Sequence, residues 1–170
     1  LEQASGGVIY LDEVADMPLG TQSKMLRVLV DQAFQRVGGT EKVQVDLRFV
    51  SSTNRDLAVE IEAGRFRQEL FHRLNVVPIS VPSLEERRED IPVLAEHFIE
   101  MLHRTQGLPM RTLAEDARAL LQTMLWPGNV RQLKNVVERV LILGDSTNLI
   151  SARELPSSEE IPAGDGRIVL

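Results

Sequence analysis

Two adjacent carboxylates, Asp12 and Glu13, are the residues of this sequence best suited to chemistry. They directly follow the apolar run 8–11, whose residue types are typical of a strand buried on both faces. In an open α/β sheet, acids at the carboxyl end of such a strand lie where ligands bind. The first acid can hold Mg²⁺ through water, and the second can orient or deprotonate an attacking water. The alternative is a strand that ends at the surface in two solvated acids.

A polar pair, Thr53 and Asn54, follows a second predicted core strand, residues 47–52. If the two runs form adjacent strands, this pair lies beside the two acids. Its neutral hydrogen-bonding side chains are suited to hold a water molecule or to contact a terminal phosphate. The four residues 53–56 are equally good turn formers, so a plain turn is the alternative interpretation.

Three arginines are candidate anion-binding residues. Arg67 and Arg73 flank a helix predicted over 66–74, and their spacing does not place them on one ideal helical face. An arginine directed at a neighbouring subunit's phosphate stabilises charge in phosphoryl transfer, an effect of about 10³–10⁵ in rate. Arg131 lies in the first turn of a predicted helix, where the dipole disfavours a cation, so an anion partner is indicated. An ordinary surface, packing or ion-pair role is the alternative for all three.

Composition excludes several classes of protein and site. The formal net charge of −6 and the pI near 5.1 argue against a general nucleic-acid-binding surface, which is normally basic. The absence of cysteine excludes disulfides and thiolate zinc sites and fits a reducing cytosol, so we expect a cytoplasmic protein. The histidines, His72, His97 and His103, have no convincing metal spacing. No apolar run is long enough to cross a membrane, and no signal peptide opens the chain.

The length of 170 residues suffices for one ordinary domain or two small ones. The sequence has no Gly-x-x-x-x-Gly-Lys-Ser/Thr pattern, and therefore no P-loop, yet it begins almost directly at a core strand. We therefore expect this sequence to be part of a longer domain.

Extended and helical patterns are mixed before about position 83. A helix is predicted over 19–32, with an inward stripe of Gln22, Met25, Leu26, Leu29 and Val30. Residues 34–45 predict a hairpin whose two glycines, Gly38 and Gly39, supply positive φ angles.

Two short helices, 57–63 and 66–74, are predicted next, and a third β-rich run covers 76–81. We place this run at a sheet edge or bulge, because Pro78 cannot donate a ladder hydrogen bond.

The remainder of the chain is predicted to be helical. One helix runs from Asp90 to Gly107, a second starts at a capping box over 112–115, and a third runs from its N-cap Asn129 to Gly144. Residues 156–166 are polar and rich in Pro, Ser, Glu and Gly, which is typical of a linker.

Six sequence blocks, in order, resemble one protein family. They read GGVIYLDE (6–13), RVGGT (36–40), TNRDL (53–57), GRFR followed by RLNV (64–67 and 73–76), ERREDIP (86–92) and WPGNVR (126–131). They are similar to the central AAA+ domain of bacterial enhancer-binding proteins, the sigma-54-dependent transcription activators. The resemblance covers about residues 1–155 and is strongest to the nitrogen-regulation response regulators of the NtrX type.

This resemblance implies an α/β fold in residues 1–83: the C-terminal part of an AAA+ P-loop NTPase core, with a parallel sheet and flanking helices. It implies a small all-α lid domain in 84–155 and a linker toward a DNA-binding domain in 156–170. The Walker A motif and the sigma-contacting loop would precede Leu1, and the P-loop strand would lie between the second and third strands predicted above.

The resemblance also implies roles for the polar residues at the strand ends. Asp12 and Glu13 would be the Walker B pair, with Asp12 holding Mg²⁺ through water and Glu13 acting on the hydrolytic water. Asn54, with Thr53, would be sensor I.

The arginines and the hairpin receive roles in the same way. Arg67 and Arg73 would be fingers that act on a neighbouring subunit, and Arg131 would be sensor II, which binds the nucleotide from the lid. The hairpin 34–45 would be a second mobile loop beside the sigma-contacting loop. The chain departs from the family pattern at Gln68–Glu69 and at Glu85, where a positive charge is usual.

The implied function is that of an ATP-hydrolysing, Mg²⁺-dependent module in a two-component response regulator. Its partners would be further copies of itself in a hexameric or heptameric ring, sigma-54 RNA polymerase holoenzyme, DNA and a sensor histidine kinase, the last two through domains outside this chain. Without a P-loop this chain alone should be a poor ATPase. The alternative is an AAA+ oligomerisation module of a DNA-binding regulator that does not activate sigma-54. Another AAA+ machine, such as a helicase loader or a chelatase subunit, is a weaker alternative.

Overall fold

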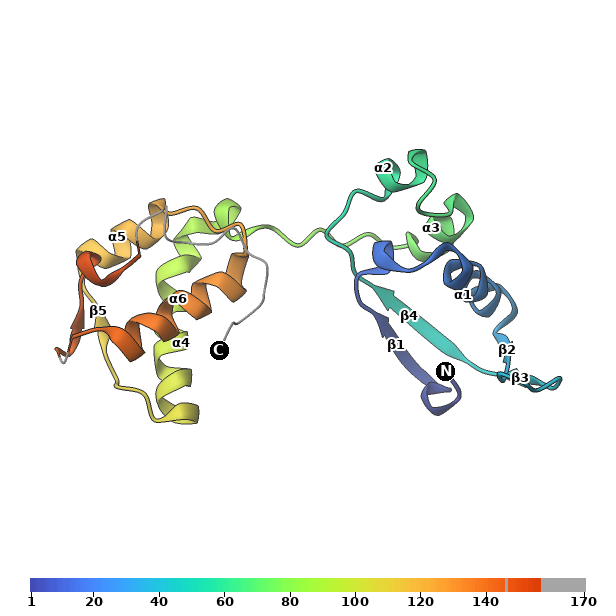
Figure 1. The fold of residues 1–170 in the computed structure, drawn as a ribbon, viewed down its shortest axis with the longest axis horizontal. Helices are drawn as coiled ribbons and strands as arrows, with labels where there is room; N and C mark the ends of the chain where they lie inside the picture. The colour runs from blue at the N-terminus through green and yellow to red at the C-terminus, as the bar shows by residue number, and fades with distance from the viewer. Residues whose placement is uncertain (146, 157–170) are drawn as a thin grey trace. The chain divides into compact units, whose positions relative to one another are not determined.

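The computed structural model describes residues 1–145 and 147–156, and the chain divides into two compact units (Figure 1). The first unit is Leu1–Ile79, and the second begins at Ser80. Except for Pro156, the predicted linker lies outside the described residues.

Two parallel strands, β1 (Gly7–Leu11) and β4 (Leu47–Ser51), form the sheet of the first unit. The two strands are adjacent, which is the condition that the sequence left open, and they pair from Gly7 opposite Leu47 to Leu11 opposite Ser51. Because the strands are parallel and in register, their carboxyl ends meet at one edge of the sheet. The residues that follow each strand therefore start from neighbouring positions.

One face of this sheet is packed and the other is open. Ile9, Leu47 and Phe49 contact the helical side, whereas Val8, Tyr10 and Val50 on the opposite face are 59%, 60% and 50% exposed. The expectation that β1 is buried on both faces is therefore wrong for the described part of the chain. The residue types favoured that prediction, but no described element of the first unit covers the second face.

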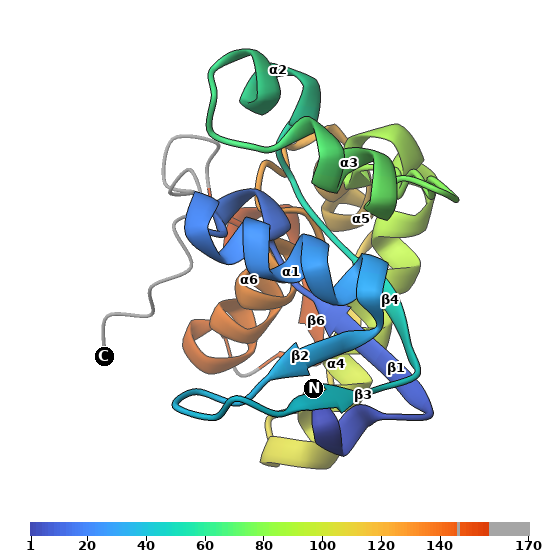
Figure 2. The same ribbon diagram turned by 90° about the vertical axis from the view of Figure 1, so that its right-hand side faces the viewer.

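Helix α1 (Leu19–Asp31) covers the packed face and leads into the antiparallel hairpin of β2 (Ala33–Gln35) and β3 (Lys42–Gln44) (Figure 2). The predicted helix and hairpin are thus confirmed. In the hairpin turn, Gly38 has a positive φ of 76°, whereas Gly39 does not. Val30 was predicted to face inward and is instead 51% exposed, because Val28 occupies the buried position near the end of α1.

Two short helices complete the first unit: α2 (Leu57–Glu62) and α3 (Gln68–Leu74). Short 3₁₀ turns, η1 (Glu2–Ala4) and η2 (Val14–Asp16), flank β1. The helix predicted over 66–74 begins later than expected, so Arg67 is its N-cap rather than a helical residue. Val14, Phe66 and Leu70 form the buried centre where η2, α1 and α3 meet.

No strand forms over residues 76–81, so the third predicted strand is wrong. The four β-branched residues of this run, Val76, Val77, Ile79 and Val81, are 74–83% exposed. A strand requires a hydrogen-bonded neighbour, and no described strand pairs with this run. Residue preference alone was therefore not enough to form a strand, and the run stays exposed.

The second unit is helical, as predicted. It comprises η3 (Leu84–Asp90), α4 (Ile91–Gln106), α5 (Glu115–Thr123), α6 (Asn129–Leu143) and η4 (Ala152–Glu154), with a two-residue parallel pair between β5 (Thr112–Leu113) and β6 (Leu149–Ile150). The predicted capping box over 112–115 is wrong, because Thr112 lies in β5. The capping boxes occur at η3, between Ser83 and Glu86, and at η4.

Trp126 lies in the core of the second unit, with 1% of its surface exposed. Its indole N–H donates to the Leu121 carbonyl at 2.9 Å, so the ring is buried without an unpaired donor. The turn that follows is as predicted, except that Gly128 is the N-cap of α6 and Asn129 is its first residue.

Arg111 ties together the end of the second unit from a position that is 3% exposed. Its guanidinium donates to the carbonyls of Thr147 and Leu149 at 2.7 and 2.9 Å and to the Glu154 carboxylate at 2.8 Å. Burial raises the pKa of the Glu154 carboxyl. Hydrogen bonds from Ser151, Arg111 and Asp145 outweigh this effect, so the pKa lies below its ordinary value of 4.5.

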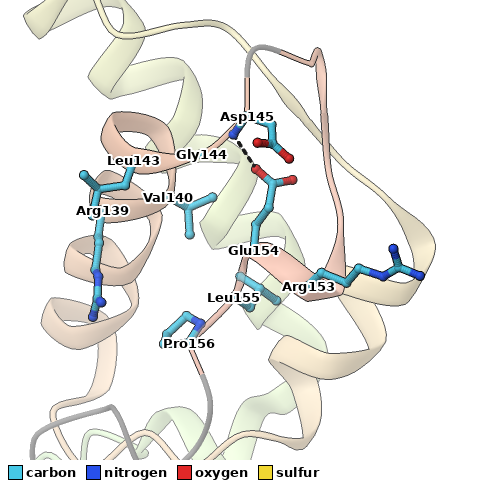
Figure 3. A pocket seen from close by; sticks show the side chains of 9 residues that line it. All are labelled: Arg139, Val140, Leu143, Gly144, Asp145, Arg153, Glu154, Leu155 and Pro156. Carbon is cyan, nitrogen blue, oxygen red and sulfur yellow. Dashed lines mark hydrogen bonds between the residues drawn. The ribbon is translucent and has the colours of Figure 1, made fainter.

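The Glu154 carboxylate lies beside a surface hollow of about 260 Å³ at this end of the unit (Figure 3). Besides Glu154, its lining residues are Arg139, Val140, Leu143, Gly144, Asp145, Arg153, Leu155 and Pro156. Its lining therefore includes both positively and negatively charged side chains.

Substituting Glu154→Gln should remove part of the acid sensitivity of this unit. Because its pKa is lower in the folded state, ionised Glu154 stabilises the fold above the ordinary pKa of 4.5, and this stabilisation is lost as the pH falls through the folded value. We expect the variant to lose about 1–3 kcal/mol near neutral pH and to show a shallower decline in acid. Unfolding measured against pH checks this.

Glu100→Gln is the matched control for that experiment, since Glu100 forms an exposed i,i+4 pair with Arg104. We expect it to change stability by less than about 0.5 kcal/mol. Equal acid slopes in the wild type and in Glu154→Gln would contradict the assignment.

In the part of the chain that the structure describes, no helix is long and apolar enough to cross a membrane.

Candidate functional site

The carboxyl edge of the β1–β4 sheet gathers the polar residues that follow the two strands. The Ser52 hydroxyl donates to the Asp12 carboxylate at 2.6 Å and accepts a longer hydrogen bond of 3.4 Å from the Glu13 backbone N–H. Backbone hydrogen bonds continue the pairing beyond the strands, from Ser52 to Leu11 at 2.9 Å and from Val14 to Ser52 at 3.0 Å. Ser52 therefore holds the Asp12 carboxylate and the backbone of Glu13, although the sequence had not marked it as a site residue.

Glu13 has a left-handed backbone conformation, with φ 49° and ψ 55°. This conformation is unfavourable for a residue with a Cβ, by about 1–2 kcal/mol, and persists where the surroundings over-determine it. Here the turn into η2 and the bond to Ser52 hold the backbone, while the carboxylate accepts from the Asn54 N–H at 3.2 Å. The side chain is thus aimed across the sheet edge at the loop after β4.

The structure places Asn54 beside Glu13, where strand adjacency predicted it to lie. The contact is made by the backbone N–H of Asn54, whose side chain is exposed. The Thr53 hydroxyl accepts from the Arg55 N–H at 3.2 Å, so this segment also forms the polar turn that was the alternative interpretation. The two interpretations are compatible, because the turn directs the N–H of Asn54 at the acid.

The donor set at this edge is suited to a hydrated Mg²⁺ ion. Asp12 is exposed and Glu13 half-buried, and both are oxygen donors, as is the Ser52 hydroxyl. Mg²⁺ usually keeps several waters and takes one or two protein carboxylates together with substrate phosphates. Among residues 1–145 and 147–156 no group of three or more His, Cys, Asp or Glu is arranged to form an all-protein cage. The edge therefore offers carboxylate and hydroxyl oxygens to an ion that keeps most of its own water.

The two arginines of the α3 region are both exposed to solvent. Arg67, at the N-cap of α3, donates its backbone N–H to the Gln22 side chain at 2.9 Å and its Nε to the Leu19 carbonyl at 3.5 Å. Arg73 lies in the last turn of α3. Neither forms an ion pair with the described residues of this unit, so the charge of each guanidinium group is not neutralised by a carboxylate there.

A chain of ion pairs joins the loops around the site. Arg55, just after Asn54, contacts Asp16 at 2.6 Å and Glu60 at 3.8 Å, and Arg65 contacts Glu60 at 2.7 Å. The hydrogen bond from Arg65, together with the nearby arginine charges, holds the pKa of the Glu60 carboxyl below its ordinary value. The segment after the acids, the segment after β4 and the segment before Arg67 are thereby linked.

Arg131 belongs to the second unit, in the first turn of α6, and it is exposed. It forms no ion pair with a described residue of its own unit. Arg131 therefore does lie at the positive end of the α6 dipole, where a cation is unfavourable, as the sequence indicated. No described carboxylate of its unit offsets this charge.

Two family patterns match the chain. Residues 1–80 match the sigma-54 interaction domain, and residues 85–163 match the AAA+ ATPase lid domain.

Relatives with known names match nearly the whole chain. The nitrogen assimilation regulatory protein NtrX of Azorhizobium caulinodans is 55% identical over 98% of this chain and 38% of its own length. The transcriptional regulator NtrC of Escherichia coli is 44% identical over 91% of this chain and 33% of its own length. The crystal structure of NtrX from Brucella abortus in complex with ATP superimposes with a TM-score of 0.87 at 53% identity, covering 94% of this chain and 38% of that one. The chain thus spans less than two fifths of the length of these relatives.

Proposed function

Because this chain belongs to the sigma-54 interaction domain family, with an AAA+ lid following, we propose that it is the ATP-hydrolysing module of a bacterial transcription regulator. In this role the module assembles into a ring and remodels sigma-54 RNA polymerase to activate transcription. The names of the relatives support a nitrogen-related transcription regulator, which we assign to the response-regulator type. The observation that carries the proposal is the group of Asp12, Ser52, Glu13 and Asn54 at the carboxyl edge of a parallel sheet.

Within this group each residue has a distinct task. Asp12, fixed by the Ser52 hydroxyl at 2.6 Å, would hold Mg²⁺ through water, and the ion when bound would neutralise charge on the phosphate oxygens. Glu13 orients the attacking water and accepts its proton, which is the chemistry of a positioned general base. The Asn54 N–H, at 3.2 Å, keeps one oxygen of Glu13 in place and leaves the other for the water.

The remaining charge stabilisation would come from an adjacent subunit. Arg67 and Arg73 are exposed and form no ion pair within the described residues, which suits arginines that contact a phosphate across an interface. A subunit that offers acids on one surface and arginines on another forms head-to-tail contacts, and these close into a ring of six or seven copies in this proposal. Arg131 would contact the nucleotide from the lid as sensor II.

The proposed activity belongs to the intact protein. The phosphates need a P-loop, and this sequence contains none. DNA binding and signal reception from a sensor kinase are likewise assigned to parts of the intact protein outside this chain.

Open-complex formation tests the proposed function. The intact protein should convert sigma-54 holoenzyme at a cognate promoter to heparin-resistant open complexes with ATP, and should fail to do so with a non-hydrolysable analogue. If the protein binds ATP and assembles but forms no open complexes, the alternative holds, in which the module only oligomerises and couples DNA sites.

A further inference from the structure

Gln22 is a completely buried polar residue in the first turn region of α1. Its side-chain Nε2 donates to the carbonyls of Met17 at 2.7 Å and Arg65 at 2.9 Å. Its Oε1 accepts from the backbone N–H of Arg67 at 2.9 Å. The amide orientation is unambiguous, because a flipped amide would direct its NH₂ group at the Arg67 N–H and its oxygen at two carbonyls.

These three hydrogen bonds connect segments that lie far apart in the sequence. Met17 ends the short η2 turn, which starts directly after Glu13. Arg65 and Arg67 belong to the loop before α3. Helix α1 packs against α3 (Figure 2). The first turn of α1 also holds the Arg67 side chain, since the Leu19 carbonyl accepts from its Nε. One buried amide thus joins the loop after the acids to the loop that carries Arg67.

We propose that Gln22 is a positioning residue, which sets the place of Arg67 relative to the acids of its own subunit. The inference rests on the proposed function, in which Arg67 acts at the neighbouring subunit's ATP. Through Gln22, a movement of the segment after Glu13 is passed to the arginine that serves the next site. Adjacent ATP sites in the ring are thereby coupled.

A purely structural role for Gln22 makes a different prediction. A buried glutamine with three partners stabilises any core in which it lies, and its loss would harm the whole unit. The Asp12–Ser52–Glu13 group, however, is held by strand pairing and by its own hydrogen bonds, none of which involves Gln22. If Gln22 is a positioning residue, its loss should misplace the Arg67 side chain that acts at the neighbouring subunit's ATP. The acid site of the same subunit should stay intact.

The substitution Gln22→Met separates these roles in the intact protein. Methionine has a similar length but leaves two carbonyls and the Arg67 N–H unpaired. We expect ATP turnover to fall about 10- to 100-fold, the effect of a misplacement near 1 Å, with ATP affinity changed by less than about threefold. Mixed with Glu13→Gln subunits, it should recover activity, because those subunits retain Gln22 and supply a placed Arg67. Mixed with Arg67→Ala subunits, it should gain no turnover.

The reference mixture is Glu13→Gln with Arg67→Ala. If this mixture fails to regain turnover, the proposed action of Arg67 between subunits is wrong. If it regains turnover while Gln22→Met with Glu13→Gln does not, the positioning role of Gln22 is wrong. Val28→Ala, which opens a cavity at another buried position of α1, is the control for lost stability and should keep most of its activity.

Amide hydrogen exchange of the wild-type ring tests the same coupling if Gln22→Met does not fold. Protection of the Arg67 amide and of the segment around Met17 should change together when ADP replaces an ATP analogue. A change in one segment with none in the other would overturn the coupling.

Discussion

Substituting Glu13→Gln is expected to lower ATP turnover of the intact protein by about 10²–10⁴-fold, the usual contribution of a general base. Glutamine keeps the length of the side chain and an oxygen that accepts from the Asn54 N–H, so the loop contact at 3.2 Å survives. It cannot take a proton from water. ATP binding should therefore change by only a few fold. Phosphate release and titration with a fluorescent nucleotide measure the two effects separately.

Glu62→Gln is the matched control for this prediction, since Glu62 is an exposed glutamate at the end of α2 in the same unit. It should leave both turnover and binding unchanged. Normal turnover in Glu13→Gln would remove Glu13 from the mechanism. A parallel loss of binding and turnover would instead indicate that the left-handed turn at Glu13, rather than proton transfer, is what the site requires.

Arg67→Ala and Arg73→Ala should each lower turnover by about 10³–10⁵-fold, the range for an arginine that stabilises transferring phosphoryl charge. Both side chains are exposed and make no ion pair in the described part of the unit, so we expect little loss of folding stability. Lysine at either position should restore only part of the rate, because it keeps the charge but lacks the planar fork. Steady-state turnover with a thermal unfolding control measures this.

Arg27→Ala provides the comparison, since Arg27 is an exposed arginine on α1. Its substitution should leave turnover within about twofold of wild type. A similar loss in Arg27→Ala and Arg67→Ala would mean that overall positive charge matters rather than a placed guanidinium group.

The residues at the edge of the sheet could be predicted from the sequence, because each of them directly follows a strand in the chain. Each apolar run ends in polar residues, and parallel neighbours bring their carboxyl ends to one edge, so strand adjacency alone placed Asn54 near Glu13. The helix over α1 and the hairpin after it likewise follow from spacing and from the turn at Gly38.

Contacts between distant segments could not be predicted in this way. Gln22 fitted the helical stripe as one more inward residue, because its partners Arg65 and Arg67 lie 43 and 45 residues away. Ser52 looked like the last residue of a strand until the register set its hydroxyl against Asp12.

The run 76–81 failed as a strand for a related reason. Its residues favour extended structure, but a strand is completed by a hydrogen-bonded neighbour, which residue preference does not supply.

The most direct test is a cryo-electron microscopy structure of the intact, assembled protein with Mg²⁺ and a non-hydrolysable ATP analogue. We expect Asp12, Glu13 and Asn54 of one subunit to surround the terminal phosphate together with Arg67 and Arg73 of its neighbour. A terminal phosphate without the acids of the β1 edge, or with both arginines of the neighbour directed away from it, would contradict the account.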